Sequence, residues 1–419
     1  MQIDLPYGSE TIGVRLPDHS EVLTLEECSA VSDLRTEIRR ALDNPIGCAP
    51  IRELARGRSD AVIIINDTTR PTPSDLMLEA LLADLAKAGI RETDVTVIIA
   101  CGNHRPNTRE EIRRMVGDDL ASRLEIINHD CNDTENLVAA DTTDTGIPVW
   151  VNAIVARAAF KIATGLIAPH HTAGYSGGRK SIIPGVAGLE TLKRHHSFPV
   201  RPYEPAFGKL KGNPFHEEAV VIARRIGVDF ILNVVQSGSG TISMVVAGEL
   251  EAAHEHGVSF CETSWDLKVP QRYDTVIVTP GGYPRDIDLH QSQKAMSSAE
   301  MVIEKGGVIV LIAECRDGVG KYAQWLKQAQ APEEVIERFK KEGFTADHSS
   351  KAFMCARALA RHEVVIACSG ISEKELAQMF FTPAASPQAA IDTALDRIGP
   401  DARVLVLPNA VNCVPRVAA

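Results

Sequence analysis

The sequence has no excess of basic residues and no long apolar run. Its 419 residues include 44 Lys and Arg against 55 Asp and Glu, which gives a formal net charge of −11. This balance argues against general binding to nucleic acid or to an anionic membrane, because both need a basic face. No segment approaches the run of about 20 apolar residues that spans a bilayer, and the first residues lack a basic-then-apolar signal pattern. We therefore expect a cytoplasmic protein with no nucleic-acid or membrane partner.

Cysteine motifs are also missing. The nine cysteines are widely spaced, no C-x-x-C pair occurs, and they stand at positions 28, 48, 101, 131, 261, 315, 355, 368 and 413. This spacing does not indicate a zinc knuckle or a thioredoxin-type redox pair. It is typical of scattered, reduced thiols that are mostly buried.

Apolar runs that alternate with helical periodicity predict the fold class. The run DAVIIIND (60–67) is typical of a strand that is buried on both faces. Leucines at helical spacing follow at 74–90, with Ser74 as the expected N-cap. Further strands are expected at 94–102, 273–284, 307–318, 362–370 and 402–410, and further helices at 108–117 and 298–306.

This alternation predicts two α/β domains, each with a largely parallel sheet flanked by helices and with the active site between them. We place the boundary where a second series of strands begins. Residues 1–265 then form an N-terminal α/β domain that carries the lysine and histidines considered below, and residues 266–419 form a C-terminal α/β domain that contributes substrate-binding residues. The first residues are expected to form a strand, a turn and a second strand.

Unusual polar loops follow three of the expected strands. They are NDTTRPTP (66–73), CGNHRPNT (101–108) and PGGYPRDIDLHQSQK (280–294). Ligands of open parallel sheets bind beyond the carboxyl ends of the strands. The recurrence of such loops therefore indicates ligand-binding sites.

A glycine-rich segment, APHHTAGYSGGRKSIIPGVAG (168–188), places a lysine and a serine after glycines. The phosphate loop of triphosphate hydrolases has the pattern G-x-x-x-x-G-K-[ST]. Here Arg179 stands between Gly178 and Lys180, so the spacing fails by one residue. The glycines can still expose backbone N–H groups to a single phosphate. On this segment alone, a mobile turn with Lys180 in solvent is the simpler interpretation.

Histidines gather around the same segment. His170 and His171 precede the glycines, His195 and His196 follow them, and His104 lies in a strand-end loop. Imidazole is the usual proton carrier near neutral pH and a common ligand of nickel, zinc and copper. Their spacing does not fit the H-E-x-x-H helix of zinc hydrolases.

The motifs NDTTRPTP, GNHRP, PHHTAGYSGGRKSIIPG, RHH and HQSQK, in this order, resemble the nickel-dependent lactate racemase family of 2-hydroxyacid racemases and epimerases. The resemblance implies a nickel pincer nucleotide, pyridinium-3,5-bisthiocarboxylic acid mononucleotide, that is covalently bound to Lys180. It implies that His196 is the protein ligand of the nickel, beside two sulfurs and a ring carbon of the cofactor. Enzymes that make this cofactor would be partners of the chain.

The resemblance also assigns the substrate and nucleotide contacts. His104 and His170 match the proton-transfer pair, and Arg70, Gln291 and Lys294 match groups that hold the carboxylate and hydroxyl of the 2-hydroxyacid substrate. The residues that match nucleotide-contacting or orienting positions are Asp67, Thr69, Ser176, Gly177 and Gly178. Gln293 is two residues from Gln291, so a shift in register would exchange them.

The chemistry of a 2-hydroxy acid fits these residue types. The hydrogen on C2 is a poor proton, because the neighbouring carboxylate is already negative. Its departure as a hydride leaves a neutral ketone, and a cationic pyridinium ring can accept that hydride. A racemase must also take the hydroxyl proton from either hand of the substrate, which needs a base on each side.

One departure from the family concerns the substrate. His290 stands where the resemblance leads us to expect a tyrosine, which favours a substrate with more polar groups than lactate. Two other functions stay open at this point. One is a zinc-dependent lyase or hydrolase that uses the same histidines, and the other is a non-enzymatic sensor in which Lys180 pairs with a phosphate.

Overall fold

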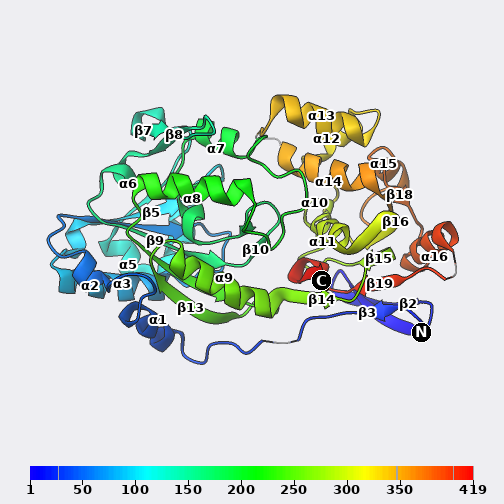
Figure 1. Ribbon diagram of the computed structural model, residues 1–419, viewed down its shortest axis with the longest axis horizontal. Coiled ribbons are helices and arrows are strands. Elements are labelled where there is room, and N and C mark those ends of the chain that lie inside the picture. The colour runs from blue at the N-terminus through cyan, green and yellow to red at the C-terminus, as the bar shows by residue number, and fades with distance from the viewer. Residues whose placement is uncertain (27, 346–347, 400, 419) are drawn as a thin grey trace. The chain divides into compact units, whose positions relative to one another are not determined.

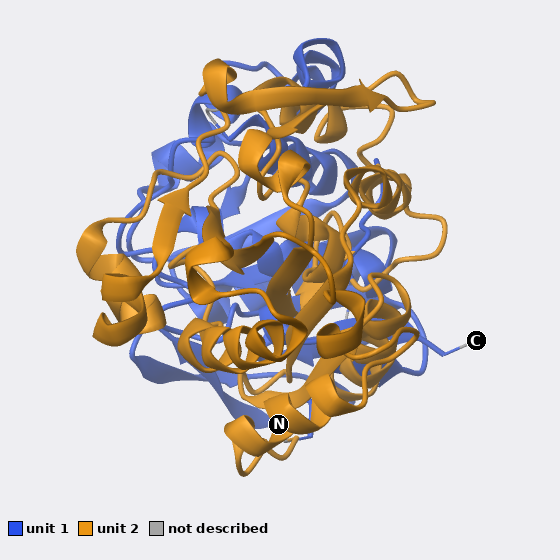
Figure 2. Ribbon diagram, turned by 90° about the vertical axis from the view of Figure 1, so that its left-hand side faces the viewer, with its two compact units in different colours: residues 1–27, 203–207, 265–419 blue, residues 28–202, 208–264 orange. Residues whose placement is uncertain are grey.

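The computed structural model describes residues 1–26, 28–345, 348–399 and 401–418 (Figure 1). The chain forms two compact units, which Figure 2 colours separately. The middle unit comprises residues 28–202 and 208–264. The terminal unit comprises residues 1–27, 203–207 and 265–419.

A six-stranded sheet forms the centre of the middle unit, in the order β13-β12-β9-β4-β5-β6. All neighbouring strands are parallel except β13, which pairs antiparallel with β12. The strands are β4 (Ala61–Asn66), β5 (Val95–Ala100), β6 (Glu125–Asn128), β9 (Lys161–Ile167), β12 (Phe230–Gln236) and β13 (Ile242–Gly248). Ile63 and Ile65 of β4 enter the core on one face, and Val62 and Ile64 enter the core on the other. Because both faces are covered, the strand is continuously apolar.

Helices cover both faces of this sheet. The first core includes side chains of α1 (Leu34–Asp43), α2 (Ile51–Leu54), α3 (Ser74–Ala88), α4 (Arg109–Val116) and α5 (Asp118–Arg123). The second includes side chains of α6 (Ala153–Arg157), α8 (Pro214–Ile226) and α9 (Ala252–Trp265). Shorter elements are β7 (Leu137–Thr142), β8 (Pro148–Asn152), β10 (Pro169–His170), β11 (Gly174–Tyr175) and α7 (Leu189–His195).

The terminal unit contains a second, wholly parallel sheet in the order β18-β17-β16-β15-β19-β3. Its strands are β3 (Glu21–Val22), β15 (Tyr273–Val278), β16 (Ile303–Ile312), β17 (Glu363–Ala367), β18 (Thr382–Pro383) and β19 (Val404–Leu407). Its helices are α10 (Leu289–Ser292), α11 (Lys294–Val302), α12 (Ala323–Lys327), α13 (Pro332–Glu342), α14 (Ser349–Arg361), α15 (Glu373–Ala377) and α16 (Pro387–Ile398). β14 (Asp266–Val269) pairs with β20 (Val414–Val417).

The first residues of the chain belong to the terminal unit. β1 (Gln2–Tyr7) and β2 (Glu10–Arg15) form the expected hairpin, and Leu5 and Val14 join the core beneath the second sheet. β3 extends that sheet by pairing with β19. The contact-based units are therefore discontinuous in sequence, whereas the sequence-based division at 265/266 places these first residues in the other domain.

The predicted α/β class with parallel sheets flanked by helices is confirmed. Two details differ. Ser74 is not a cap but the first residue of α3, and Pro73 at the cap position makes no side-chain hydrogen bond. The helix expected at 298–306 runs from Lys294 to Val302, because the following residues already begin β16. No described helix is long and apolar enough to cross a membrane.

Candidate active site

A cavity of about 200 Å³ lies at the carboxyl ends of β4, β5 and β9 in the middle unit. These strands are neighbours in the sheet, so their loops meet at one edge. Eight of the predicted site residues line the cavity, namely Asp67, Arg70, His104, His170, Ser176, Gly177, Lys180 and His196. They come from four separate segments of the chain. Only the parallel order of the strands brings them together.

His104 is oriented by a buried carboxylate. Its Nδ1 lies 2.6 Å from Oδ2 of Asp67, whose other oxygen accepts hydrogen bonds from the backbone and hydroxyl of Thr69. Burial acts to raise the pKa of Asp67, but the hydrogen bonds from His104 and Thr69 outweigh it and lower this pKa. The carboxylate therefore accepts the Nδ1 proton and leaves Nε2 as the acceptor atom of the neutral ring. The His104 side chain is 52% exposed, so substrate can reach it.

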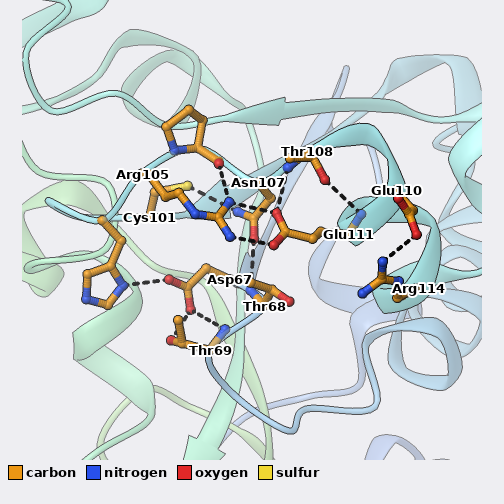
Figure 3. A network of polar contacts seen from close by, with 12 residues as sticks. Asp67, Thr68, Thr69, Cys101, Arg105, Asn107, Thr108, Glu110, Glu111 and Arg114 are labelled. Carbon is orange, nitrogen blue, oxygen red and sulfur yellow. Dashed lines mark hydrogen bonds and ion pairs between the residues drawn. The ribbon is translucent and has the colours of Figure 1, made fainter. Parts of the chain in front are cut away.

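Two asparagines hold the loops beneath this pair. Asn107 Oδ1 accepts from the backbone N–H of Thr68 at 2.9 Å, and Asn107 Nδ2 donates to Asn128 Oδ1 at 3.0 Å. Asn128 in turn donates to the backbone carbonyl of Asn107. Figure 3 shows Asn107 between Thr68 and Cys101, beside Asp67. These bonds link the loops after β4, β5 and β6 and fix the distance between Asp67 and His104.

Arg105 points into a different network. Its guanidinium pairs with Glu111 in Figure 3, and Glu111 also completes a capping box with Thr108 at the start of α4. These contacts, led by Arg105, lower the pKa of Glu111 to about 2. Arg105 is therefore occupied at the helix start and does not line the cavity.

His170 is held by the backbone instead of by a carboxylate. Its Nδ1 accepts hydrogen bonds from the N–H groups of Thr172 and Ala173, at 3.2 and 3.1 Å. The neutral ring therefore carries its proton on Nε2, which lies 3.3 Å from Lys180 Nζ. For that N–H to donate, the lysine nitrogen must present a lone pair. A neutral Lys180 amine meets this requirement, whereas an ammonium ion does not.

The electrostatic surroundings of Lys180 agree with this protonation state. Burial, reinforced by the positive charges of Arg179 and Arg70, lowers the pKa of Lys180 well below its usual range. A neutral lysine is a nucleophile, whereas an ammonium ion is not. The cavity thus contains an amine that is suited to forming a covalent bond.

The glycine turn before Lys180 is closely packed. Gly177 has a φ of +79°, and a Cβ there would meet Asn233 Oδ1 at 2.6 Å and Ile167 Cγ1 at 2.7 Å. The next N–H, of Gly178, donates to Asn233 Oδ1 at 2.8 Å. Only glycine fits this conformation and this space.

Arg179 is a fully buried guanidinium beneath the turn. It donates to the backbone carbonyls of Ala173, Tyr175 and Gly177, and it lies 2.8 Å from His254 Nε2. Burial lowers the pKa of Arg179 to about 9. The arginine therefore turns the carbonyls of the loop inward and adds positive charge beneath the cavity.

The two consecutive histidines at the end of α7 point differently. His196 lines the cavity, and its Nδ1 donates to the carbonyl of Leu192 at 3.0 Å, which leaves Nε2 with the lone pair. Burial and neighbouring positive charge lower the pKa of His196 well below its usual value, so the ring is neutral near pH 7. His195 is 0% exposed, donates from Nε2 to the carbonyl of Phe215, and does not line the cavity.

Comparisons with known proteins identify the family. Models of the N-terminal and C-terminal domains of lactate racemase match residues 7–205 and 269–414. The chain is 33% identical over 424 residues to lactate racemase of Thermoanaerobacterium thermosaccharolyticum, which covers 99% of both chains. It is 32% identical over 426 residues to lactate racemase of Lactiplantibacillus plantarum, covering 98% of this chain and 99% of the relative. The chain belongs to the lactate racemase family.

A solved structure agrees with this lactate racemase family membership. The apoprotein of the T. thermosaccharolyticum lactate racemase matches with a TM-score of 0.89 and 32% identity, covering 99% of this chain and 100% of that one. A crystal structure of a Thermotoga maritima protein, 17% identical with a TM-score of 0.63, shares the fold. The chain is thus an isomerase of the racemase type. An apoprotein is an enzyme without its cofactor, so a lactate racemase works with a cofactor on a small molecule.

The remaining residues that the lactate racemase resemblance assigns lie near or outside the cavity. Thr69 and Gly178 adjoin lining residues without lining the cavity themselves. Gln291 and Lys294 belong to the terminal unit, where Lys294 Nζ donates to Gln291 Oε1. Gln291 is half-buried, whereas Gln293 is 2% exposed, which favours Gln291 as the residue that can reach a ligand.

Sequence reasoning missed several residues that this lactate racemase fold brings to the site. Asn66 lines the cavity, Asn107 and Asn128 hold its loops, and Arg179 and Asn233 hold the glycine turn. The sequence does contain a signal for two of these residues. Asn66 and Asn107 stand in the same strand-end motifs as Asp67 and His104. Asn233 sits inside an apolar strand, which the pattern of its neighbours does not distinguish.

Proposed function

We propose that this chain is a racemase or epimerase that inverts C2 of a 2-hydroxy acid by reversible hydride transfer to a lysine-tethered nickel pincer nucleotide. The substrate is lactate or a larger, more polar hydroxy acid. The observation that carries the proposal is the meeting of Lys180, His170, His104 and His196 around one cavity. The reaction is redox-neutral and consumes no second substrate.

The donor atoms fit such a cofactor better than a bare metal ion. Among the described residues, no group of three or more His, Cys, Asp or Glu side chains is arranged to hold a metal ion. A zinc lyase or hydrolase site usually has three protein ligands. A nickel ion bound by His196 Nε2 would take its other ligands from the nucleotide. The Leu192 carbonyl that accepts from His196 Nδ1 is the kind of partner that orients a metal-bound imidazole.

The tether and the phosphate also have suitable partners. Lys180 would form the covalent bond as a neutral amine, and Ser176 and Gly177 of the turn line the cavity in which the single phosphate would lie. The buried charge of Arg179 would offset the negative charge of that phosphate. When bound, the nickel pyridinium group supplies an acceptor for the substrate's C2 hydride.

The two histidines would move the hydroxyl proton. His104 Nε2 accepts the proton from one enantiomer, and the Asp67 carboxylate lies beside the positive charge that the ring acquires. His170 would act on the other side of the carbonyl through Nε2, because its Nδ1 is held by two backbone N–H groups and cannot exchange a proton with the substrate. Every inversion therefore uses one histidine as base and the other as acid.

Positively charged side chains would bind the carboxylate of the substrate. Arg70 lines the cavity and would pair with the carboxylate in a bidentate manner. Lys294 and Gln291, which are hydrogen-bonded to each other, stay the further substrate contacts that the family resemblance assigns. A fixed carboxylate allows the planar ketone to turn and present its other face. His290 packs edge to face on Tyr322 and His348 in the terminal unit.

The decisive experiment is an intact-mass measurement on protein from a host that makes the cofactor. We expect a covalent adduct that maps to Lys180, together with nickel and interconversion of the enantiomers of a 2-hydroxy acid. Lys193, an exposed lysine on α7, provides the control variant Lys193→Ala, which should keep the adduct. An active enzyme without adduct, or with zinc alone, would overturn the proposal.

A further inference from the structure

Two of the nine cysteines meet in the terminal unit. Cys315 follows β16 and Cys368 follows β17, and these strands are parallel neighbours with Ile312 opposite Ala367. The loops stay paired beyond the strands, because Gly370 N–H donates to the carbonyl of Glu314 at 2.9 Å. The two side chains lie close enough that each shifts the pKa of the other. The two cysteines are 53 residues apart in sequence, so no cysteine spacing motif predicts the pair.

The backbone around Cys315 is unusual. Cys315 has a φ of +52°, a left-handed conformation that few residues other than glycine adopt. The hydrogen bonds of its N–H to Asp286 O at 2.8 Å and of its carbonyl to the N–H of Gly318 at 2.9 Å hold it there. Gly370 packs so closely that a Cβ would stand 2.0 Å from Cys315 O. Backbone strain of this kind is concentrated at functional positions.

The two thiols differ in access and in acidity. Cys315 is 0% exposed, whereas Cys368 is half-buried. The neighbouring Cys315 thiol lowers the pKa of Cys368, with further help from backbone hydrogen bonds at Ile371 and Gly370, and Cys368 in turn raises the pKa of Cys315. A half-buried, more acidic thiol beside a buried, less acidic one is the arrangement of a reactive cysteine with its resolving partner.

We infer that Cys368 and Cys315 are a reversible oxidation site, at which a hydroperoxide converts the two thiols into a disulfide. The Cys368 thiolate attacks the peroxide, which forms a sulfenic acid and releases hydroxide, or an alcohol from an organic peroxide. The Cys315 thiol then attacks the sulfenic sulfur, which forms the S–S bond and releases water. Two thiols lose two hydrogens, and the peroxide is reduced. A dithiol reverses the reaction by exchange.

Cys48, Cys355 and Cys413 lack these features. Cys48 is also half-buried, but burial and the charge of Glu249 raise its pKa, so little thiolate is present at neutral pH. Burial raises the pKa of Cys355 and of Cys413 to about 12. Cys48 is therefore the matched control for accessibility without acidity.

The pair is coupled to a segment that carries a predicted substrate contact. Ser292 Oγ lies 3.5 Å from Cys315 Sγ at the end of α10, the helix that carries Gln291. A disulfide has no S–H group, so oxidation would remove the thiol proton from the contact with Ser292 Oγ. Any effect of oxidation on catalysis rests on the function proposed above, whereas the oxidation itself does not.

The test uses the full-length protein without cofactor. It is treated with an equimolar amount of hydrogen peroxide, quenched with N-ethylmaleimide and measured as intact mass, followed by peptide mapping without reductant. Relative to the reduced and fully alkylated protein, we expect two fewer N-ethylmaleimide adducts and a further loss of about 2 Da, a linked peptide pair containing Cys315 and Cys368, and full reversal by dithiothreitol. Reduced Cys368, or Cys368 sulfinic acid without a disulfide in the wild-type protein, would overturn the inference.

Variants assign the two roles. Cys315→Ser should leave a Cys368 sulfenic acid that dimedone traps, and Cys368→Ser should leave Cys315 reduced. Cys48→Ser should form the disulfide at the wild-type rate. A disulfide that survives in Cys368→Ser, or that links a different pair, would contradict the assignment.

Discussion

The two sides of the cavity hold their histidines in opposite ways. On the side of β4 and β5, His104 donates from Nδ1 to a carboxylate. On the side of the glycine turn, Nδ1 of His170 accepts from two backbone N–H groups. In both rings Nε2 is the nitrogen that is left for the substrate. In the neutral state, Nε2 of His104 has a lone pair, whereas Nε2 of His170 carries the proton. The two rings thus rest in different tautomers, although the two directions of the proposed inversion use each of them both as base and as acid.

The largest effect should come from the glycine-turn side, through Lys180→Ala. Without the neutral amine no covalent tether can form, so the adduct mass disappears and racemisation falls to background. Intact mass and a chiral assay on protein from a cofactor-producing host measure both. If the Lys180→Ala variant kept the adduct, another residue would be the tether, and the glycine-turn side would not hold the cofactor.

His196→Ala should have the next largest effect. One metal ligand is lost while the covalent tether stays, so we expect the adduct mass without stoichiometric nickel. Metal analysis per mole of adduct checks this, with the exposed His256→Ala as the control. Unchanged nickel content in His196→Ala would show that the protein ligand lies elsewhere.

The comparison itself is tested by His104→Ala and His170→Ala. Each variant should lose about 10²- to 10⁴-fold in racemisation, which is the usual contribution of a general acid or base. In a single turnover, each should still transfer hydride from the enantiomer whose base remains, seen as a change in cofactor absorbance. We expect opposite enantiomer preferences in the two variants. Equal impairment with both enantiomers would return these residues to an orienting role.

Asp67→Asn should weaken only the β4–β5 side. The amide cannot accept and orient the Nδ1 proton as a carboxylate does, so we expect a smaller loss, about 10- to 100-fold, and a changed tautomer of His104. Because the folded pKa of Asp67 is lowered, the carboxylate's contribution is present at neutral pH and disappears only as the pH falls through that lowered value. ¹⁵N NMR of the imidazole in the apoprotein reports the tautomer. An unchanged tautomer in the variant would exclude the orienting role.

Asn107→Leu should have the smallest effect. It removes the hydrogen bond to Thr68 and the link to Asn128, which costs about 1 kcal/mol for each bond. We expect a lower melting temperature and a tenfold or smaller loss in kcat, with the His104 tautomer disturbed and the Lys180 adduct intact. The exposed Asn132→Ala is the control. Loss of the adduct would show that the two sides are not independent.

The sequence predicted the fold class and the segments that form the site. It did not predict most of the hydrogen bonds between the residues of the site. Continuous apolar strands and helical leucines predict the parallel sheets, and the polar loops predict the edge where ligands bind. The partners of Nδ1 in His170 are backbone groups, which no residue pattern reveals. β3 has two residues, too few for any periodicity, so its place beside β19 was not predictable.

The placement of β3 beside β19 has a consequence for biosynthesis. The middle unit is complete in sequence by residue 264, so it can fold while translation continues. The edge strand of the terminal unit is made among the first residues, and its partner is made near the end of the chain. Strand β3 therefore has no partner strand until β19 (Val404–Leu407) has been synthesised, and the hairpin β1–β2 likewise precedes the sheet on which it packs. A charged residue, Glu21, in so short a strand reduces the hazard of sheet edges that pair with the wrong chain until then.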